Sequence, residues 1–300
     1  MQIESVNNLG ISFNEALSRI GKSVLKNDDI TIENDDKAKP FVKWVGGKRS
    51  LIKELYLRTP QTYKSYYEPF IGGGALLFAL APSGATISDI NLDLVITYAV
   101  IKNKPQELIK RLAKHKVNHC EEYYYKIRKQ FINDNDVEVA GRFIYLNKTC
   151  YNGLYRVNNK GEFNVPMGRY KNPAIIDETN IIACSKLLQN VDIKYQDFSK
   201  ISPNKGDFVY IDPPYHPINS TSFTKYTKLD FTETDQIKLY QKCKELNDKG
   251  VYFMLSNSNI QFIKHLYKDF YIDIIEAPRT INCKANGRKN AEEVLIRNYE

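Results

Sequence analysis

The sequence lacks the cysteine patterns that mark disulfide-bonded or zinc-binding proteins. Its five cysteines stand at positions 120, 150, 184, 243 and 283, an odd number without a C-x-x-C pair. A scattered, odd set argues against a disulfide framework and against a zinc site, so we expect no bound metal. Free thiols fit a reducing compartment, and we therefore expect a cytoplasmic protein.

Long apolar runs are also missing. The longest apolar-looking stretch, residues 70–82, contains three glycines and is too short to cross a membrane. The N-terminus shows no basic-then-apolar signal pattern, so we expect no membrane contact. The dinucleotide-binding pattern G-x-G-x-x-G is absent as well, which weakens an interpretation as an NAD-binding protein.

Negative charge is in short supply. Lysine and arginine number 43 against 35 aspartate and glutamate, which gives a net charge of +8 over 300 residues. This excess suggests a polyanionic partner, although a merely basic protein is the commoner explanation of charge alone. The length suits one large domain, or one domain with an insertion.

The stretch 208–215 predicts the chemistry most directly. An apolar run, 208–211, indicates a buried strand, and it ends in Asp212-Pro213-Pro214-Tyr215. The prolines fix φ and remove two backbone donors, so the chain leaves the sheet in a rigid, extended form. A carboxylate and a proline-locked carbonyl can accept both hydrogens of an exocyclic amine, and Tyr215 offers a face for a flipped base. The pattern favours methyl transfer to a nucleobase amine over an ordinary Asp-Pro turn.

A glycine corner predicts a nucleoside-binding site. A strand over 65–70 runs into Gly72-Gly73-Gly74 and a helix over 76–80, as at the cofactor corner of a doubly wound fold. A second strand, 85–88, ends in Asp89, seventeen positions after Gly72. A carboxylate there can bind both ribose hydroxyls, with a helix cap as the alternative.

Two further stretches are ambiguous on their own. Trp44 precedes a Gly-Gly turn and Lys48, at the start of a helix over 50–57, where a carboxylate or phosphate would be attracted. A turn with a packed tryptophan explains that stretch equally well. Asp197-Phe198 follows a strand over 191–195 and could bond and stack a cofactor adenine, or form a cap.

The segment 141–173 is basic and turn-rich. It holds six positive residues and one acid, Glu162, so its charge balance is 6 − 1 = +5. The six are Arg142, Lys148, Arg156, Lys160, Arg169 and Lys171. A turn at 158–161 predicts a hairpin between strands 153–157 and 162–165. Such a hairpin can read a DNA groove, whereas a solvated basic loop is the alternative. The side chains suited to this are Tyr151, Asn152, Leu154, Tyr155, Arg156 and Tyr170.

The rest of the chain alternates between expected helices and strands. Helices are expected over 11–25, 93–101, 105–115, 121–131, 178–189, 234–249 and 260–267, and strands over 251–255, 271–276 and 293–297, the last at a sheet edge. The tyrosine-rich helix 121–131 is expected to pack its rings. The polar loop 218–229 is a candidate lid, and the acid-free segment 279–289, with Lys284 and Arg288, indicates a phosphate-contacting loop.

Four of these stretches together resemble the Dam-type DNA adenine N6-methyltransferases, the α-group enzymes with a DPPY motif. The resemblance runs from about Pro40 to Tyr299. The motifs, in order, are Lys43-Trp44-Val45-Gly46-Gly47-Lys48, Glu68-Pro69-Phe70-Ile71-Gly72-Gly73-Gly74, Tyr151 through Tyr170 with Gly161-Glu162-Phe163-Asn164-Val165-Pro166, and Asp212-Pro213-Pro214-Tyr215. One motif can arise by chance, but four in the family's order are hard to explain otherwise.

The resemblance implies an α/β, Rossmann-like methyltransferase fold. Its sheet is doubly wound and mostly parallel, and a helical and β-hairpin DNA-recognition domain is inserted into it. The implied catalytic domain comprises residues 39–94 and 175–300, and the target-recognition domain residues 95–174. Residues 1–38 form an N-terminal extension of unknown role, since family members commonly start close to the Lys43-Trp44 motif.

The resemblance also assigns site residues. The implied catalytic pocket is Asp212, Pro213, Pro214 and Tyr215. The implied contacts of the cofactor, S-adenosyl-L-methionine, are Trp44, Lys48, Phe70, Gly72, Gly74, Asp89, Asp197, Phe198 and Asp212. The implied DNA contacts are Lys43, Tyr151, Asn152, Leu154, Arg156 and Tyr170.

We therefore expect methylation of the N6 amine of adenine in double-stranded DNA. Base flipping and a GATC target are implied by the resemblance, and a groove-shaped hairpin favours duplex DNA over RNA. An inactive DNA-binding protein on this scaffold, or an amino-methyltransferase of cytosine or RNA, stays open. We expect a monomer or weak dimer from a bacterium, archaeon or phage, with a cognate restriction endonuclease as an optional partner at the same site.

Substitutions should separate cofactor contacts from DNA contacts. We expect Trp44→Ala and Asp89→Ala to weaken S-adenosyl-L-methionine binding and to spare DNA affinity. We expect Lys284→Ala and Arg288→Ala to weaken binding to all DNA sequences and to flatten its salt dependence, because phosphate contacts release counterions. Equilibrium binding of each ligand at several salt concentrations measures both effects. Unchanged cofactor affinity in Asp89→Ala would remove the ribose assignment.

Overall fold

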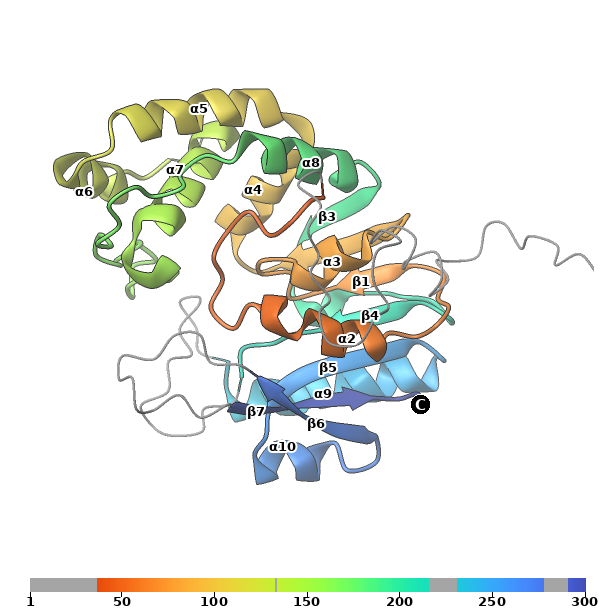
Figure 1. Ribbon diagram of the computed structural model, residues 1–300. Coiled ribbons are helices and arrows are strands. Elements are labelled where there is room, and N and C mark those ends of the chain that lie inside the picture. The colour runs from red at the N-terminus through yellow and green to blue at the C-terminus, as the bar shows by residue number, and fades with distance from the viewer. Residues whose placement is uncertain (1–36, 133, 216–230, 278–290) are drawn as a thin grey trace, which may run out of the picture.

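The computed structural model describes residues 37–132, 134–215, 231–277 and 291–300 (Figure 1). The expected helix 11–25, the candidate lid 218–229 and the basic loop 279–289 lie outside these residues, and so do Lys284 and Arg288. Within the described ranges, no helix has the length and apolar character needed to span a membrane.

Seven strands form one sheet in the order β3-β2-β1-β4-β5-β7-β6. Their bounds are β1 Tyr66–Glu68, β2 Ala85–Asp89, β3 Val191–Tyr195, β4 Phe208–Ile211, β5 Tyr252–Ser258, β6 Tyr271–Ala277 and β7 Ala291–Arg297. Neighbouring strands are parallel except for the pairs β5–β7 and β6–β7, which are antiparallel. The expected α/β fold with a mostly parallel sheet is confirmed.

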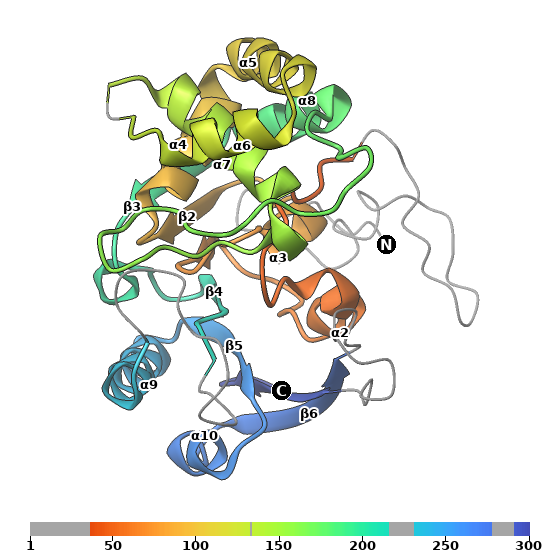
Figure 2. The ribbon, with the colours of Figure 1, turned by 90° about the vertical axis from the view of Figure 1, so that its left-hand side faces the viewer.

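Helices cover both faces of this sheet. Their bounds are α2 Ile52–Leu57, α3 Ala75–Leu80, α4 Leu92–Asn103, α5 Pro105–Val117, α6 Glu121–Lys129, α7 Asp136–Thr149, α8 Glu178–Leu188, α9 Glu233–Asp248 and α10 Gln261–Leu266, with short 3-10 helices η1 Lys48–Leu51, η2 Tyr151–Gly153 and η3 Phe198–Lys200. Figure 2 shows α2 and α9 on opposite faces, and α4 to α7 stacked at one end of the sheet.

Strand β4 is buried on both faces because its side chains alternate between two cores. Phe208 and Tyr210 pack with the core that includes Leu55 of α2. Val209 and Ile211 pack with the core that includes Leu239 of α9. A period of two along an entirely apolar strand is what a central strand with helices on both sides requires.

The strand order reverses beside β1, whose neighbours are β2 on one side and β4 on the other. The carboxyl ends of these parallel strands share one edge of the sheet, and ligands bind at such a switch point in open α/β folds. The turn after β1 carries Gly72, β2 ends at Asp89, and β4 is followed by Asp212. The fold therefore collects these expected site residues at one edge.

Helix α7 was not expected, and the basic segment 141–173 begins inside it. The side chain of Asn135 caps its start by accepting two backbone N–H groups. The guanidinium of Arg142 donates to the carbonyls of Ile127 and Arg128, at 3.0 and 2.9 Å, at the end of α6. Part of the positive charge that suggested DNA binding therefore joins two helices instead.

The expected hairpin is present as a turn but hardly as strands. The N–H of Gly161 donates to the carbonyl of Asn158 at 2.8 Å, which closes the turn. Val157 and Phe163 then form only an isolated bridge, so regular strands over 153–157 and 162–165 are wrong. Side chains of α6 bond the carbonyl of Val165, at 2.9 and 3.2 Å, in place of a ladder partner.

Strand β7 lies inside the sheet, between β5 and β6, and β6 takes the edge. The expectation of an edge strand at 293–297 is therefore wrong. Val294, Leu295 and Ile296 are all fully buried, so both faces of the strand are covered. Consecutive apolar residues are typical of such an interior strand, whereas alternation is typical of a strand with one wet face.

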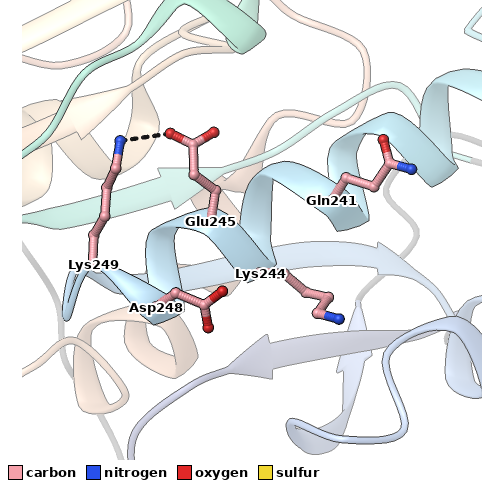
Figure 3. A pocket seen from close by; sticks show the side chains of 5 residues that line it. All are labelled: Gln241, Lys244, Glu245, Asp248 and Lys249. Carbon is pink, nitrogen blue, oxygen red and sulfur yellow. Dashed lines mark hydrogen bonds and ion pairs between the residues drawn. The ribbon is translucent and has the colours of Figure 1, made fainter.

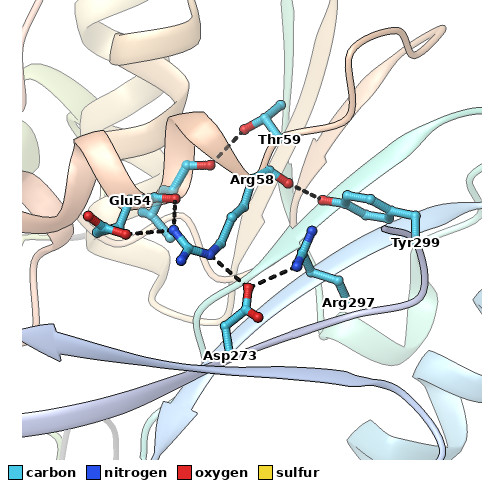
Figure 4. A network of polar contacts seen from close by, with 7 residues as sticks. Glu54, Arg58, Thr59, Asp273, Arg297 and Tyr299 are labelled. Atoms are coloured by element: carbon cyan, nitrogen blue, oxygen red, sulfur yellow. Dashed lines mark hydrogen bonds and ion pairs between the residues drawn. The ribbon is translucent and has the colours of Figure 1, made fainter.

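A polar network ties the end of α2 to the far strands of the sheet (Figure 4). Asp273 on β6 accepts hydrogen bonds from Nε of Arg58 at 2.7 Å and from Nη2 of Arg297, on β7, at 2.8 Å. Arg58 also donates to Glu54 at 2.6 Å, and its carbonyl accepts the hydroxyl of Tyr299 at 2.8 Å. The network holds α2, and the preceding η1, close to β6 and β7.

Candidate catalytic and DNA-binding site

Asp212 directly follows β4 and forms an ion pair with Lys48. Its Oδ1 lies 2.9 Å from Nζ of Lys48, whose side chain is only 4% exposed. Nζ of Lys48 also donates to the carbonyl of Gly46 at 2.6 Å. Burial raises the pKa of Asp212 to about 6, against the lowering effect of Lys48. Lys48, expected among the cofactor contacts, thus lies on the expected catalytic carboxylate.

Tyr215 is held both at its hydroxyl and over its ring. The hydroxyl donates to Oε2 of Glu293 at 2.7 Å, and Nζ of Lys48 lies 4.7 Å from the ring centre. Burial, with the charges of Asp212 and Glu293, raises the pKa of Tyr215 well above its usual value, so the phenol stays protonated and donates. We refer to Lys48, Asp212, Tyr215 and Glu293 as the Lys48 cluster.

Two acids of this region were not singled out from the sequence as site residues. Glu293 lies opposite Ser258 in the β5–β7 pair, and an acid directly before a buried apolar run is the signal that could have marked it. Glu68, buried at the end of β1, accepts the hydroxyl of Tyr66 at 2.7 Å. Burial, aided by the charge of Asp212, raises the pKa of Glu68 to about 8. At neutral pH Glu68 is therefore mostly protonated.

A buried amide also reaches the catalytic turn. Nε2 of Gln236, on α9, donates to the carbonyl of Pro214 at 3.1 Å. Oε1 of Gln236 accepts Nδ2 of Asn257, on β5, at 3.0 Å. No local motif marks either residue, because they meet the turn only through the packing of α9 and β5 around β4.

The turn after β1 forms a tight corner against Trp44. A Cβ atom on Gly72 would lie 2.7 Å from Cδ1 of the indole, so only glycine fits there. The N–H of Gly72 donates to the carboxylate of Asp89 at 3.3 Å, and its carbonyl accepts the hydroxyl of Tyr98 at 3.1 Å. Gly74 follows with a φ of 68°, in the left-handed region. Trp44, Gly72 and Asp89 of the expected cofactor set therefore lie together.

Phe70 and Phe198, also expected at the cofactor, stack on each other with ring centres 5.4 Å apart. Phe198 is buried, whereas the neighbouring Asp197 is exposed. The carboxylate of Asp197 accepts the N–H of Ser199 at 2.9 Å, so the capping alternative is present in the structure.

Lys43 and Tyr170 meet at the start of the recognition segment. Nζ of Lys43 lies 4.1 Å from the ring centre of Tyr170, and a Cβ on Gly153 would lie 2.5 Å from Cδ of Lys43. Asn147 of α7 accepts the N–H of Lys43 at 2.8 Å and donates to the carbonyls of Lys43 and Gly153, at 2.7 and 3.2 Å. The expected DNA contacts Lys43 and Tyr170 thus share one patch with the η2 turn.

The other expected DNA contacts differ in how exposed they are and in how many protein contacts they make. Tyr151 is 45% exposed, and Asn152 adopts a left-handed φ of 54°, which asparagine tolerates. Leu154 packs against the core. Arg156 donates Nε to Oδ1 of Asn164 at 2.6 Å and Nη2 to its carbonyl at 3.2 Å. Because a guanidinium carries five N–H donors, both terminal nitrogens of Arg156 keep donors for DNA.

Trp44 joins the cofactor corner to the recognition segment. Its ring stacks on Tyr155, with centres 5.8 Å apart, and lies 6.4 Å from the ring of Phe143 on α7. In Figure 2 the chain that follows η2 runs below the helices α4 to α7, on the side that faces strands β4 and β5. One aromatic contact therefore connects the two parts of the expected site.

A surface hollow on the outer side of α9 is separate from these residues. Its lining residues are Gln241, Lys244, Glu245, Asp248 and Lys249 (Figure 3). They all lie on α9 or directly after it, and the ion pair between Glu245 and Lys249, at 2.6 Å, is exposed. No residue of the expected site lines this hollow, so we assign it no ligand.

The chain is similar to known proteins over most of its length. The family model of D12 class N6 adenine-specific DNA methyltransferases matches residues 44–281. The chain is 46% identical, over 288 residues, to the type II methyltransferase M.MjaIII of Methanocaldococcus jannaschii, covering 88% of this chain and 100% of that protein. It is 44% identical, over 277 residues, to the type II methyltransferase M1.LlaDCHI of Lactococcus lactis subsp. cremoris, covering 89% and 98%.

A third relative is more distant. The DNA adenine methylase of Escherichia coli (strain K12) is 31% identical over 265 residues, which are 86% of this chain and 95% of that protein. The matched range 44–281 contains Lys48, the glycine corner, the recognition segment and the catalytic turn. The resemblance seen in the sequence is confirmed: the chain belongs to the D12 class N6 adenine-specific DNA methyltransferases.

Proposed function

We propose that this methyltransferase transfers the methyl group of S-adenosyl-L-methionine to the N6 amine of adenine in duplex DNA, at Asp212-Pro213-Pro214-Tyr215. The Lys48 cluster carries this proposal. It holds a half-buried carboxylate at the switch point of the sheet, 2.9 Å from a buried ammonium. A fixed acceptor of this kind can orient an amine without any rearrangement of solvent.

The target amine must be oriented because its lone pair is delocalised into the base. Asp212 accepts one of its N–H groups. Gln236 donates to one of the two lone pairs of the Pro214 carbonyl at 3.1 Å, and we assign the second N–H of the amine to the carbonyl of Pro213, which lies next to Asp212 in the chain. With both hydrogens directed at acceptors, the nitrogen lone pair points out of the ring plane, toward the methyl donor.

The corner between β1 and β2 fits the nucleoside part of the cofactor. Burial raises the pKa of Asp89 to about 6, although the N–H groups of Asn91 and Gly72 oppose the rise. Two ribose hydroxyls would add donors to this carboxylate. The aromatic side chains of the corner are Trp44, Phe70 and Phe198. S-adenosyl-L-methionine supplies an electrophilic methyl group on its sulfonium.

The reaction needs no covalent intermediate on the protein, because the amine nitrogen itself can attack. Burial raises the pKa of the thiols of Cys150 and Cys184 to about 12, so neither supplies a thiolate. Asp212 orients the amine, and the nitrogen loses one proton to solvent after the transfer. The protein's part is positioning and electrostatics.

We further propose the domain arrangement and the setting. Residues 95–174 recognise the target, and residues 39–94 with 175–300 bind the cofactor and catalyse. Because two relatives are named type II methyltransferases, we propose that a restriction endonuclease acts separately on the same site, in the cytoplasm of a bacterium, archaeon or phage host. The protein acts as a monomer or weak dimer, which light scattering of the full chain would test.

Asp212→Ala should abolish transfer of labelled methyl to plasmid DNA while the variant still folds and binds DNA. In the wild type, kcat/KM should fall about tenfold per pH unit below the Asp212 pKa of about 6, because the protonated acid is a poorer acceptor. Nucleoside analysis of the product identifies the base. Substantial turnover by Asp212→Ala would remove this residue from the mechanism, and label on cytosine or RNA would redirect the substrate assignment.

We propose base flipping because the target amine lies inside the duplex, whereas Asp212 lies at the sheet edge. Lys48 covers one face of Tyr215, so the base stacks on the other face. We assign Tyr151, whose side chain is 45% exposed, to the gap left in the duplex. A 2-aminopurine at the target position should brighten on binding. No increase at saturating wild-type protein would count against flipping.

We propose GATC as the target, on the resemblance to Dam-type enzymes and on the donors available at Lys43 and Arg156. A bidentate contact from Arg156 to a guanine is worth about 1–3 kcal/mol of discrimination. Leu154 and Tyr170 can contact a thymine methyl. Arg156→Ala should relax one guanine position more than it lowers non-specific affinity. Plasmid methylated in vitro should resist nucleases that adenine methylation blocks at GATC, and full cleavage despite methyl incorporation would overturn this target.

A further inference from the structure

We propose that Gln236 is a positioning residue for methyl transfer, which fixes the catalytic turn through the carbonyl of Pro214. The inference rests on the catalytic role proposed above for Asp212 and Tyr215. The side chain of Gln236 is fully buried, at 0% exposure. Its Nε2 donates to the carbonyl of Pro214 at 3.1 Å, and its Oε1 accepts Nδ2 of Asn257 at 3.0 Å.

The direction of these hydrogen bonds is set by the backbone. The N–H of Ser258 donates to Oδ1 of Asn257 at 2.8 Å. A backbone N–H can only donate, so Asn257 presents its oxygen there and its NH₂ group to Gln236. Gln236 must then present its oxygen to Asn257 and its own NH₂ to Pro214. The donors therefore run in one direction and end on the carbonyl of Pro214.

Both amides stand on rigid elements. Asn257 lies on β5, which is paired with β4 on one side and β7 on the other. Gln236 lies near the start of α9, where Thr232 and Asp235 form a capping box. The position of the Gln236 side chain is consequently set by the sheet and the helix together, and not by the catalytic turn that it contacts.

The contact fixes the one soft torsion that the two prolines leave at Pro214. Proline rings hold φ near −65°, and peptide bonds are planar, so only ψ can vary. The direction of the Pro214 carbonyl defines that ψ, and with it the point from which Tyr215 projects. The hydroxyl of Tyr215 is bound by Glu293 at 2.7 Å. Gln236 and Glu293 therefore hold Tyr215 from its two ends.

Gln236→Leu keeps the approximate volume of the side chain and removes the donor. We expect the single-turnover rate of methyl transfer on saturating DNA to fall about 10- to 100-fold, because small displacements at a reacting centre have effects of that size. The Kd values for DNA and for S-adenosyl-L-methionine should stay at wild-type values. Gln241→Leu, at an exposed glutamine of the same helix (Figure 3), should keep the wild-type rate. A wild-type rate for Gln236→Leu would overturn the proposal.

Gln236→Glu distinguishes the hydrogen bond from packing. A protonated glutamic acid can donate to the carbonyl of Pro214, whereas a carboxylate repels it, and burial raises the pKa of such an acid. The ratio of the Gln236→Glu rate to the wild-type rate should rise as pH falls, while the same ratio for Gln236→Leu stays flat. Division by the wild-type rate cancels the titration of Asp212, which both enzymes share. We refer to the hydrogen bonds from Asn257 through Gln236 to the carbonyl of Pro214 as the relay. A ratio for Gln236→Glu that does not change with pH would contradict this relay.

Asn257→Asp tests the second amide and keeps the proposal open to refutation if Gln236→Leu does not fold. The aspartate still accepts the N–H of Ser258 but no longer donates to Gln236. We expect slower transfer with wild-type DNA affinity, and a wild-type rate would break the relay at Asn257. Activity in Asp212→Ala would refute the catalytic site itself. Normal rates in the Gln236 and Asn257 variants alone would refute only the relay.

Discussion

The ion pair between Lys48 and Asp212 is the contact on which the rest of the site depends. Removing a carboxylate from water costs several kcal/mol unless a partner compensates, and Nζ of Lys48 lies 2.9 Å from Asp212. Burial pushes Asp212 toward its protonated form, and the ammonium opposes it, so its pKa settles at about 6. At neutral pH the carboxylate is therefore still an acceptor. Tyr215 donates its hydroxyl to Glu293 at 2.7 Å, and Lys48 lies 4.7 Å from its ring centre, so the same cluster also holds the tyrosine.

The fold assembles this cluster from segments that are far apart in the chain. The switch point between β1 and β4 places the glycine corner beside the catalytic turn. The antiparallel insertion of β7 next to β5 brings Glu293 to the same edge, opposite Ser258. The bonds from Arg58 and Arg297 to Asp273 then join the end of α2 to β6 and β7 (Figure 4). Lys48 begins the short helix η1 directly before α2. Its Nζ is thereby held 2.9 Å from Asp212 and 3.9 Å from Glu293.

Local signals in the sequence were enough to predict the edge of the sheet at which the site residues lie, and the turns there. They were not enough to predict contacts between residues far apart in the chain. The proline pair after an apolar strand and the glycine triplet before a helix predicted where Asp212 and Gly72 lie. Helix α7 was missed because it buries residues on most sides, which blurs the helical period. Gln236 and Glu293 carry no motif, since each acts on a residue more than twenty positions away. The resemblance assigned Lys48 to the cofactor, and no local signal marks its pairing with Asp212, because the two residues meet only in the folded chain.

Titration of the Asp212 carboxyl carbon by ¹³C NMR, in the wild type and in Lys48→Met, tests the ion pair most directly. Asp212→Asn assigns the signal, and the spectra also report whether each variant is folded. If Lys48 keeps Asp212 ionised, the wild type titrates near pH 6 and Lys48→Met titrates at a higher pH, because burial and Glu293 then act without an opposing cation. A midpoint in Lys48→Met that is unchanged or lower would contradict the dependence of the site on this contact.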